Sequence, residues 1–382
     1  MTKRLEPYGR HIRYVRDERC VWAGYAIVAL ALALSSDLRP HRVWGALAAA
    51  GYAVAAILAC SVRSRPAARM VAVAGAVVVP LVSMVTAGLG QLEIAVVERS
   101  GQLLLTTGNP YVSNPTVVAD FNPYLPGMAL FGVLPGDVRW WTGSAFAATL
   151  AAAGLSRAWL LACPLIALPL AVGGIDLPVV GLMCLGVVLA GQGRPGRAGL
   201  VLGFAATLKW TAWPALPVAL ALIAVSRGHR YALRYGAVAL ATATAAVLPF
   251  TLASPKGFYR SVIAFPLGLT DTASPAASPL PGHLLATYAP GGKVIALALL
   301  AASALLTSVS LVVRPPVGTR TAAARLALGL GLATALMPAT RFGYLVYPLV
   351  LGALASRRPQ YERTAGTTPA LPVDPSQKKA LV

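Results

Sequence analysis

Five charged residues stand at or near the ends of apolar stretches, where an unpaired charge is costly and a functional role is the first hypothesis. They are Glu93, Glu98, Asp176, Lys209 and Arg341. A carboxylate held at such a place can accept a proton from a hydroxyl group. Lysine can bind phosphate as a point charge, and arginine can bind it through its planar fork. These residue types suit chemistry on a lipid headgroup at a membrane surface.

Glu93 and Glu98 begin the stretch 91–111, which follows an apolar segment directly. The stretch has the pattern of a short amphipathic helix, and Gly108 followed by Asn-Pro-Tyr is typical of its end. Glu93 therefore lies within a few residues of the expected membrane surface, where it can meet a hydroxyl group. The alternative is that both glutamates only solvate an interfacial helix, and the spacing leaves both interpretations open.

Asp176 and Lys209 each have a functional and a structural interpretation. Asp176 lies between two apolar segments and precedes Pro178, so it is either a functional carboxylate or the N-cap of a helix. Lys209 lies beside Trp210 and Trp213. It either binds a phosphate or extends its amine to the membrane edge.

Arg341 lies in a tight turn that two tyrosines follow. It either binds phosphate oxygens or pairs structurally with Asp176 or another outer acid.

The four cysteines and four histidines show no metal-ligand spacing, and no glycine-rich phosphate loop or nucleotide signature is present. We therefore expect no metal site and no cofactor; a divalent cation is compatible with the sequence, but nothing in it indicates one. A lipid-linked donor that carries its own leaving group fits these absences.

The elements that must position these residues are membrane helices. The chain has 382 residues, of which 57% are hydrophobic and 12% charged, with a mean hydropathy of +0.70. This balance excludes a soluble globular enzyme and disorder over most of the length. The apolar runs predict an all-α, polytopic membrane protein with about twelve transmembrane helices. Their expected ranges are 21–36, 43–62, 70–90, 138–155, 157–173, 177–193, 198–209, 212–226, 231–252, 291–313, 322–338 and 343–356.

Charge gives the expected orientation. Most of the 32 Lys and Arg residues fall in the segments that this topology places in the cytoplasm, and most acids fall outside, so both termini are expected to be cytoplasmic. Membrane topology explains the net charge of +20 better than nucleic-acid binding does. We predict a cytoplasmic N-terminal tail (1–20), retained and not a signal peptide. We also predict a transmembrane domain (21–356) with large outer loops near 91–137 and 254–290. The chain is then expected to end in a disordered cytoplasmic tail (357–382).

The order of several motifs carries a family resemblance. The sequence resembles the C-type superfamily of integral membrane glycosyltransferases, in particular glycosyltransferase family 87 in its actinobacterial, polyprenol-phosphate-mannose-dependent branch. The motifs are the stretch 91–111, Asn122-Pro-Tyr-Leu-Pro126, Gly173-Gly-Ile-Asp176, 203–214, 265–270 with 274–279, and Ala339-Thr-Arg-Phe-Gly-Tyr344. Glutamate stands where that family usually has aspartate, and the large loop follows the third expected span where it commonly follows the first.

The resemblance implies a hexosyltransferase with interfacial helices in its large outer loop. It would move a hexose, with mannose expected, from a polyprenyl-phosphate donor to a lipid or glycan acceptor, with inversion, at the outer face of a bacterial plasma membrane. The resemblance places the base on Glu93, with Glu98 second. Lys209 and Arg341 would bind the donor phosphate. The residues expected to orient the acceptor or the base are Asp176, Tyr111, Asn122 and Tyr124.

Two other functions fit parts of the pattern. A transporter or flippase of lipid-linked sugars could use the same outer cations, but it would need a second access path from the cytoplasm. A noncatalytic lipid-binding subunit is the third interpretation, favoured if both glutamates face bulk water away from Lys209 and Arg341.

Overall fold

The computed structural model describes residues 6–272 and 275–357, and helices dominate this part of the chain. No β-strand occurs among these residues, although one isolated parallel bridge joins Ala277 to Thr340. The all-α prediction is therefore confirmed for the described chain.

Within residues 6–272 and 275–357, six helical stretches are long and apolar enough to cross a membrane, so the chain is a multi-pass membrane protein. Two of the six combine several elements. The six stretches are Glu18–Ser35 within α1 (Glu6–Ser35); α2 (Arg39–Leu58); Arg65–Thr86, made of α3 (Arg65–Val73), the π-helical η1 (Ala74–Val78) and α4 (Val79–Thr86); Trp210–Arg227, made of η4 (Trp210–Ala212) and α12 (Ala215–Arg227); α13 (His229–Ala253); and α16 (Gly292–Val313).

Shorter helices make up the rest of the bundle, and every expected span contains helix. They are α7 (Val138–Ala152), α8 (Ala158–Leu161), α9 (Pro164–Val172), α10 (Leu177–Gly191), α11 (Pro195–Leu208), α17 (Thr319–Leu336), η6 (Phe342–Leu345) and α18 (Val346–Ala355). The count of about twelve spans stays a prediction, because these helices are shorter than the roughly 20 residues of a straight crossing. As expected, α11 and α12 are a short pair, with 14 and 13 residues, on either side of Lys209.

The two predicted outer loops contain short helices. The first contains α5 (Leu92–Thr107), η2 (Val118–Asp120), η3 (Pro126–Met128) and α6 (Ala129–Val133); the second contains α14 (Pro255–Phe258), η5 (Tyr259–Ala264) and α15 (Pro281–Tyr288). α5 ends at Gly108, whose φ of +72° favours glycine. α1 begins at Glu6, so the described part of the predicted N-terminal tail is helical and continuous with the first span. Residues 358–382 of the predicted C-terminal tail lie outside the described residues.

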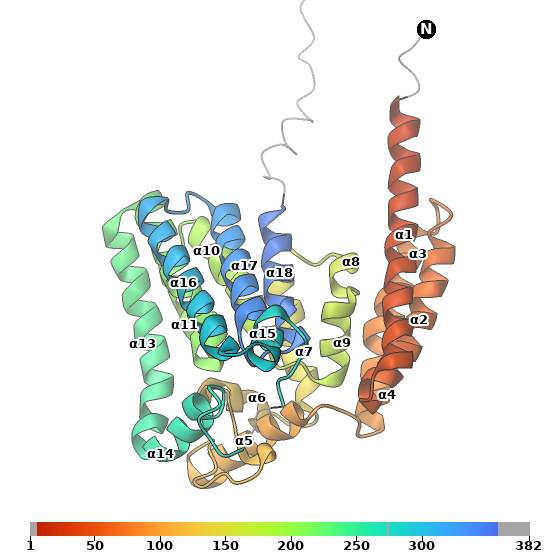
Figure 1. The fold of residues 1–382 in the computed structure, drawn as a ribbon. Coiled ribbons are helices and arrows are strands. Elements are labelled where there is room, and N and C mark those ends of the chain that lie inside the picture. The colour runs from red at the N-terminus through yellow and green to blue at the C-terminus, as the bar shows by residue number, and fades with distance from the viewer. Residues whose placement is uncertain (1–5, 273–274, 358–382) are drawn as a thin grey trace, which may run out of the picture.

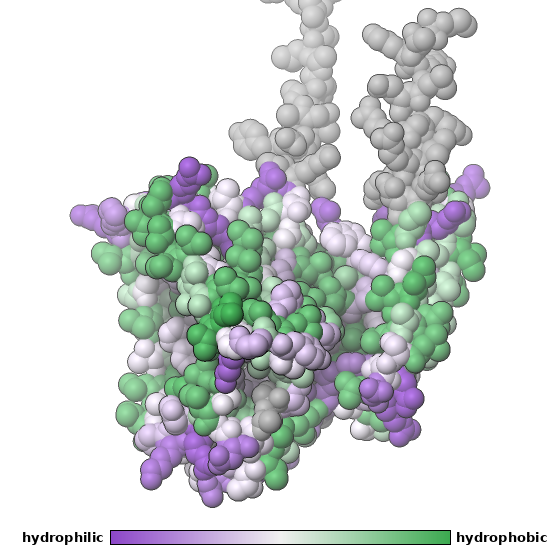
Figure 2. All heavy atoms as spheres, viewed as in Figure 1, coloured by the Kyte–Doolittle hydropathy of each residue, from purple (hydrophilic) through white to green (hydrophobic). Residues whose placement is uncertain are grey.

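Figure 1 shows how the helices are arranged. α1 to α4 form one bundle beside a larger bundle that contains α7, α9 to α13 and α16 to α18. α5, α6 and α14 lie across one end of the larger bundle, which we call the loop end. The opposite end, where α18 ends at Ala355, is the terminal end. Figure 2 shows apolar side chains over the middle of the molecule and polar ones concentrated near both ends, as a membrane protein requires.

The smaller bundle has its own core and is attached to the larger one through α9. Trp22, Trp44 and Tyr52 are fully buried in that core. The hydroxyl of Tyr52 donates a hydrogen bond to the carbonyl of Ala162, just before α9, and α9 itself contributes small apolar side chains to the same core. These contacts hold α9, which leads to Asp176, against the smaller bundle.

Candidate functional site

A buried ion pair lies at the loop end, between the starts of α10 and η4. α9 ends at Gly173, whose φ of +102° a larger residue would adopt only with strain, and the turn that follows brings Asp176 in front of α10. The Oδ1 atom of Asp176 lies 2.5 Å from Nζ of Lys209 and accepts a 2.6 Å hydrogen bond from the Tyr347 hydroxyl. The two charged side chains are only 17% and 12% exposed.

These contacts argue against the structural alternatives considered for the two residues, a helix cap and an amine at the membrane edge. Asp176 stands at the N-cap position of α10, but its side chain makes no capping hydrogen bond; its carboxylate is used by Lys209 and Tyr347. The Lys209 ammonium does not extend to solvent. It lies 4.6 Å from the ring centre of Tyr344 and 5.4 Å from that of Tyr124, as in cation–π contacts.

A second ion pair joins α5 to the turn before η6. The Arg341 guanidinium contacts the carboxylate of Glu93, which lies in the first turn of α5. The alternative expected for Arg341 was a pairing with Asp176 or another acid, and its partner in the structure is Glu93. The backbone N–H of Gln91 donates to the carbonyl of Val172 at 2.9 Å, so the start of α5 is held against the end of α9.

The segment from Arg341 to Tyr347 links the two ion pairs. Three of its residues, spaced three apart, make the contacts. Arg341 contacts Glu93, Tyr344 contacts Lys209, and Tyr347 contacts Asp176. The Arg341 carbonyl accepts a 3.0 Å hydrogen bond from the N–H of Tyr344, which holds this turn together. Two carboxylates and two cations from four distant parts of the sequence thus form one cluster, here called the loop-end cluster.

The other predicted orienting residues are buried and shape the loop around Tyr124. The Tyr111 hydroxyl donates to the Tyr124 carbonyl at 3.0 Å, and the side-chain oxygen of Asn122 accepts from the Tyr124 N–H at 3.1 Å. The N–H of Leu125 donates to the Leu208 carbonyl at 3.0 Å, which brings Tyr124 beside Lys209. Tyr111 and Asn122 contact Tyr124, not the charged groups.

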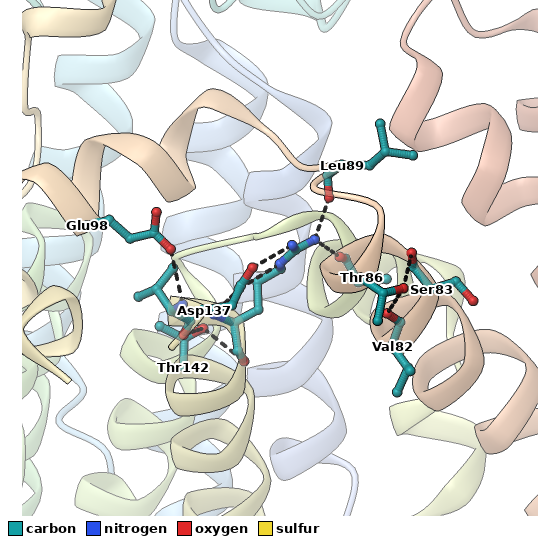
Figure 3. A network of polar contacts seen from close by, with 10 residues as sticks. Val82, Ser83, Thr86, Leu89, Glu98, Asp137 and Thr142 are labelled. Atoms are coloured by element: carbon teal, nitrogen blue, oxygen red, sulfur yellow. Dashed lines mark hydrogen bonds and ion pairs between the residues drawn. The ribbon is translucent and has the colours of Figure 1, made fainter. Parts of the chain in front are cut away.

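Glu98 points away from the loop-end cluster. Its carboxylate accepts a 3.4 Å hydrogen bond from the N–H of Val138 at the start of α7 (Figure 3), where the helix dipole favours negative charge. Glu93 and Glu98 therefore have different partners, although they lie on the same helix.

A network around Arg139, which the sequence did not single out, includes Asp137 and Leu89 of Figure 3. The Arg139 side chain is 3% exposed and donates to both oxygens of Asp137, at 2.8 and 2.6 Å. It also donates to the carbonyls of Leu89 (2.7 Å) and Ala171 (3.0 Å). Burial acts to raise the pKa of Asp137, but the hydrogen bonds from Arg139 outweigh it and lower that pKa. Arg139 thus ties α7 to the segments that precede α5 and end α9.

Sequence reasoning missed Tyr344, Tyr347 and Thr211 in the loop-end cluster and, elsewhere on α5, the buried guanidinium atoms of Arg99. Tyr344 and Tyr347 were noted only as neighbours of Arg341, although their spacing of three residues was the available signal. Thr211 Oγ1 lies 2.6 Å from the Tyr347 hydroxyl. The Nε and Nη2 atoms of Arg99 are buried and have no hydrogen-bond partner in the described part of the chain; burial lowers the pKa of Arg99, while Asp120 acts in the opposite direction.

The arrangement suits an anionic ligand that bears a phosphate. The Arg341 and Lys209 side chains offer hydrogen-bond donors. Each is paired with a carboxylate, which a phosphate can replace. Among the side chains that the structure describes, no group of three or more His, Cys, Asp or Glu residues is gathered as metal ligands.

Comparison with known proteins gives one result. The model of glycosyltransferase family 87 matches residues 103–340, more than half of the chain. The match includes Asp176 and Lys209, whereas Glu93, Glu98 and Arg341 lie just outside it. No curated protein and no solved structure matches the chain significantly. The chain belongs to glycosyltransferase family 87 and is a membrane glycosyltransferase.

Proposed function

We propose that this chain transfers a hexose, with mannose as the expected sugar, from a polyprenyl-phosphate donor to a hydroxyl of a lipid or glycan acceptor. The observation that carries the proposal is the loop-end cluster, where two carboxylate–cation pairs meet through the segment 341–347. Such a cluster supplies phosphate-binding cations and a proton acceptor together.

We further propose that the loop-end cluster faces outward from a bacterial plasma membrane, with about twelve spans and both termini in the cytoplasm. Basic residues gather in the segments that join helices at the terminal end, among them Arg63, Arg157, Arg230 and Arg320. This distribution is what the positive-inside rule expects of the cytoplasmic side.

In the proposed resting state Arg341 is neutralised by Glu93, and Lys209 by Asp176. A phosphate that enters the cluster competes for Arg341, because a guanidinium can bind two phosphate oxygens at once. Glu93 then loses its cation. Its carboxylate becomes a stronger base, because the opposite charge no longer stabilises the ionised form. Donor binding would thus activate the base.

In the chemical step a Glu93 oxygen takes the proton of the acceptor hydroxyl. The acceptor oxygen forms a bond to the anomeric carbon, on the side opposite the phosphate. The bond between the anomeric carbon and the phosphate oxygen breaks, and its electron pair stays on the departing polyprenyl phosphate. The sugar is inverted, and Arg341 and Lys209 stabilise the negative charge that develops on the leaving group.

The remaining residues have supporting roles in this proposal. Asp176 holds Lys209 in place, and the Tyr347 hydroxyl donates to Asp176. Tyr124 lies beside the Lys209 ammonium, on the loop that Tyr111 and Asn122 shape. No nucleotide, metal or other cofactor is assigned a role. Glu98 is the second candidate for the base, ranked lower because its carboxylate faces the start of α7.

Family membership favours transfer over the transport of lipid-linked sugars. A noncatalytic lipid-binding subunit was expected to leave both glutamates in bulk water, whereas Glu93 is 19% exposed and contacts Arg341. Both observations support the enzymatic proposal.

The test is a transfer assay with the purified full-length protein, radiolabelled polyprenyl-phosphate mannose and a membrane-lipid extract. Because a general base contributes about 10² to 10⁴ in rate, Glu93→Gln should reduce product formation at least tenfold. Glu98→Gln is the matched control and should keep most of the activity. Full activity of Glu93→Gln with loss in Glu98→Gln would move the role to Glu98. If the wild-type protein forms no labelled product, the proposal that polyprenyl-phosphate mannose is the donor is refuted.

A further inference from the structure

A cavity of about 350 Å³ lies at the terminal end, opposite the loop-end cluster, between α8 and α18 (Figure 1). Its size falls within the roughly 300 to 1,000 Å³ of ligand pockets. Arg157, Trp159 and Arg357 line its charged part, and Leu160, Pro348 and Leu349 line its apolar part. Nothing in the proposed transfer reaction uses this cavity.

Among the described residues, the charge at the rim is positive and no carboxylate neutralises it. The Arg157 side chain is exposed and forms no hydrogen bond or ion pair with the described residues. Among the same residues, Arg357 donates only to the carbonyl of Ala153. A third guanidinium, that of Arg320, is nearby, where it donates to the Ala355 carbonyl at 3.0 Å. No carboxylate of the described part of the chain forms an ion pair with these arginines.

The cavity is amphiphilic along its length. It follows α18 from Pro348 and continues past the end of the helix to Arg357. The guanidinium groups lie at the end nearest the chain termini, and the apolar side chains lie deeper in the bundle. Trp159 is 39% exposed at the charged end, a position typical of tryptophan at the membrane interface.

We propose that this cavity binds one anionic phospholipid, with the headgroup between Arg157 and Arg357 and the acyl chains beside Leu160, Pro348 and Leu349. Charge complementarity selects an anionic headgroup, because two unpaired arginines attract a lipid with a net negative charge more strongly than a zwitterionic one. The apolar wall selects a lipid over a free anion. The lipid would sit in the leaflet opposite the proposed transfer site.

The test is native mass spectrometry of the full-length protein in detergent, titrated with phosphatidylglycerol or with phosphatidylcholine. We expect one retained phosphatidylglycerol that binds about tenfold more tightly than phosphatidylcholine, a ratio equivalent to about 1.4 kcal/mol. The double variant Arg157→Gln/Arg357→Gln should lose this preference. The matched control, Arg63→Gln/Arg230→Gln, removes two exposed arginines of the same end that lie outside the cavity and should retain the lipid.

A steric variant covers the case in which the loss of Arg357 disturbs folding. Gly352 lines the cavity, and a Cβ atom added there meets no other atom within 4 Å. Gly352→Leu should therefore fill the cavity, fold normally and exclude the lipid while all arginines stay in place. Equal binding of phosphatidylcholine, equal loss in the control variant, retention by Gly352→Leu, or displacement by millimolar inorganic phosphate would each overturn the proposal.

Discussion

Removing the charge of Asp176 should destabilise the protein strongly. In Asp176→Asn the side chain keeps its shape and can still accept the Tyr347 hydrogen bond, but Lys209 loses its counter-ion. At 2.5 Å and an effective dielectric constant of about 20, the gross attraction is about 6.6 kcal/mol. Desolvation offsets part of it, and breaking a buried pair typically costs about 3 to 5 kcal/mol. We expect a loss of about 4 kcal/mol.

The assay is a double-mutant cycle on the free energy of unfolding in mixed detergent micelles. Asp176→Asn and Lys209→Met should each be destabilising, while the double variant should lose less than the sum, because no charge is left buried alone. The expected coupling energy is about 2 to 3 kcal/mol. Glu18 and Arg69 provide the control cycle: Arg69 is 42% exposed, so their coupling should be below about 1 kcal/mol. Additive effects at Asp176 and Lys209 would refute the reasoning.

Three further predictions concern stability. Arg139→Met should cost about 2 to 4 kcal/mol in unfolding free energy, because it leaves a partly buried carboxylate and two carbonyls without this partner; a loss below 1 kcal/mol would contradict it. Gly101→Ala should destabilise by about 1 to 3 kcal/mol, because its Cβ would lie 2.1 Å from the Gly132 backbone, whereas the unobstructed Gly343→Ala should be neutral in the same denaturation series. Backbone hydrogen bonds lower the pKa of Asp120, so its contribution to stability is present above about pH 4 and declines as the pH falls through the lowered value; acid titration of Asp120→Asn should show a difference from wild type that disappears at low pH.

The helices could be predicted well because their signal is local. Apolar runs bounded by charge, Pro or Gly indicate a helix wherever the bilayer requires backbone hydrogen bonds to be satisfied internally. The short pair on either side of Lys209 and the end of α5 at Gly108 followed from the same signals. The π-helical residues of η1 were not predicted, since apolar periodicity does not distinguish a π-helical turn from an α-helical one.

The site could be predicted only in part. The cost of an unpaired charge near a membrane pointed to Asp176, Lys209 and Arg341. Their partners are set by tertiary packing, so the sequence could not show that Arg341 meets Glu93 and that Asp176 meets Lys209. The same holds for Tyr347. It lies in an apolar helix, and the sequence does not show that its hydroxyl donates to Asp176.

The most direct measurement is an electron cryomicroscopy structure of the full-length protein with polyprenyl phosphate bound. We expect the phosphate on Arg341 and near Lys209, with the Glu93 carboxylate separated from Arg341 and free to receive a proton. A phosphate bound elsewhere, with the contact between Glu93 and Arg341 intact, would contradict donor-triggered activation of the base at the loop-end cluster.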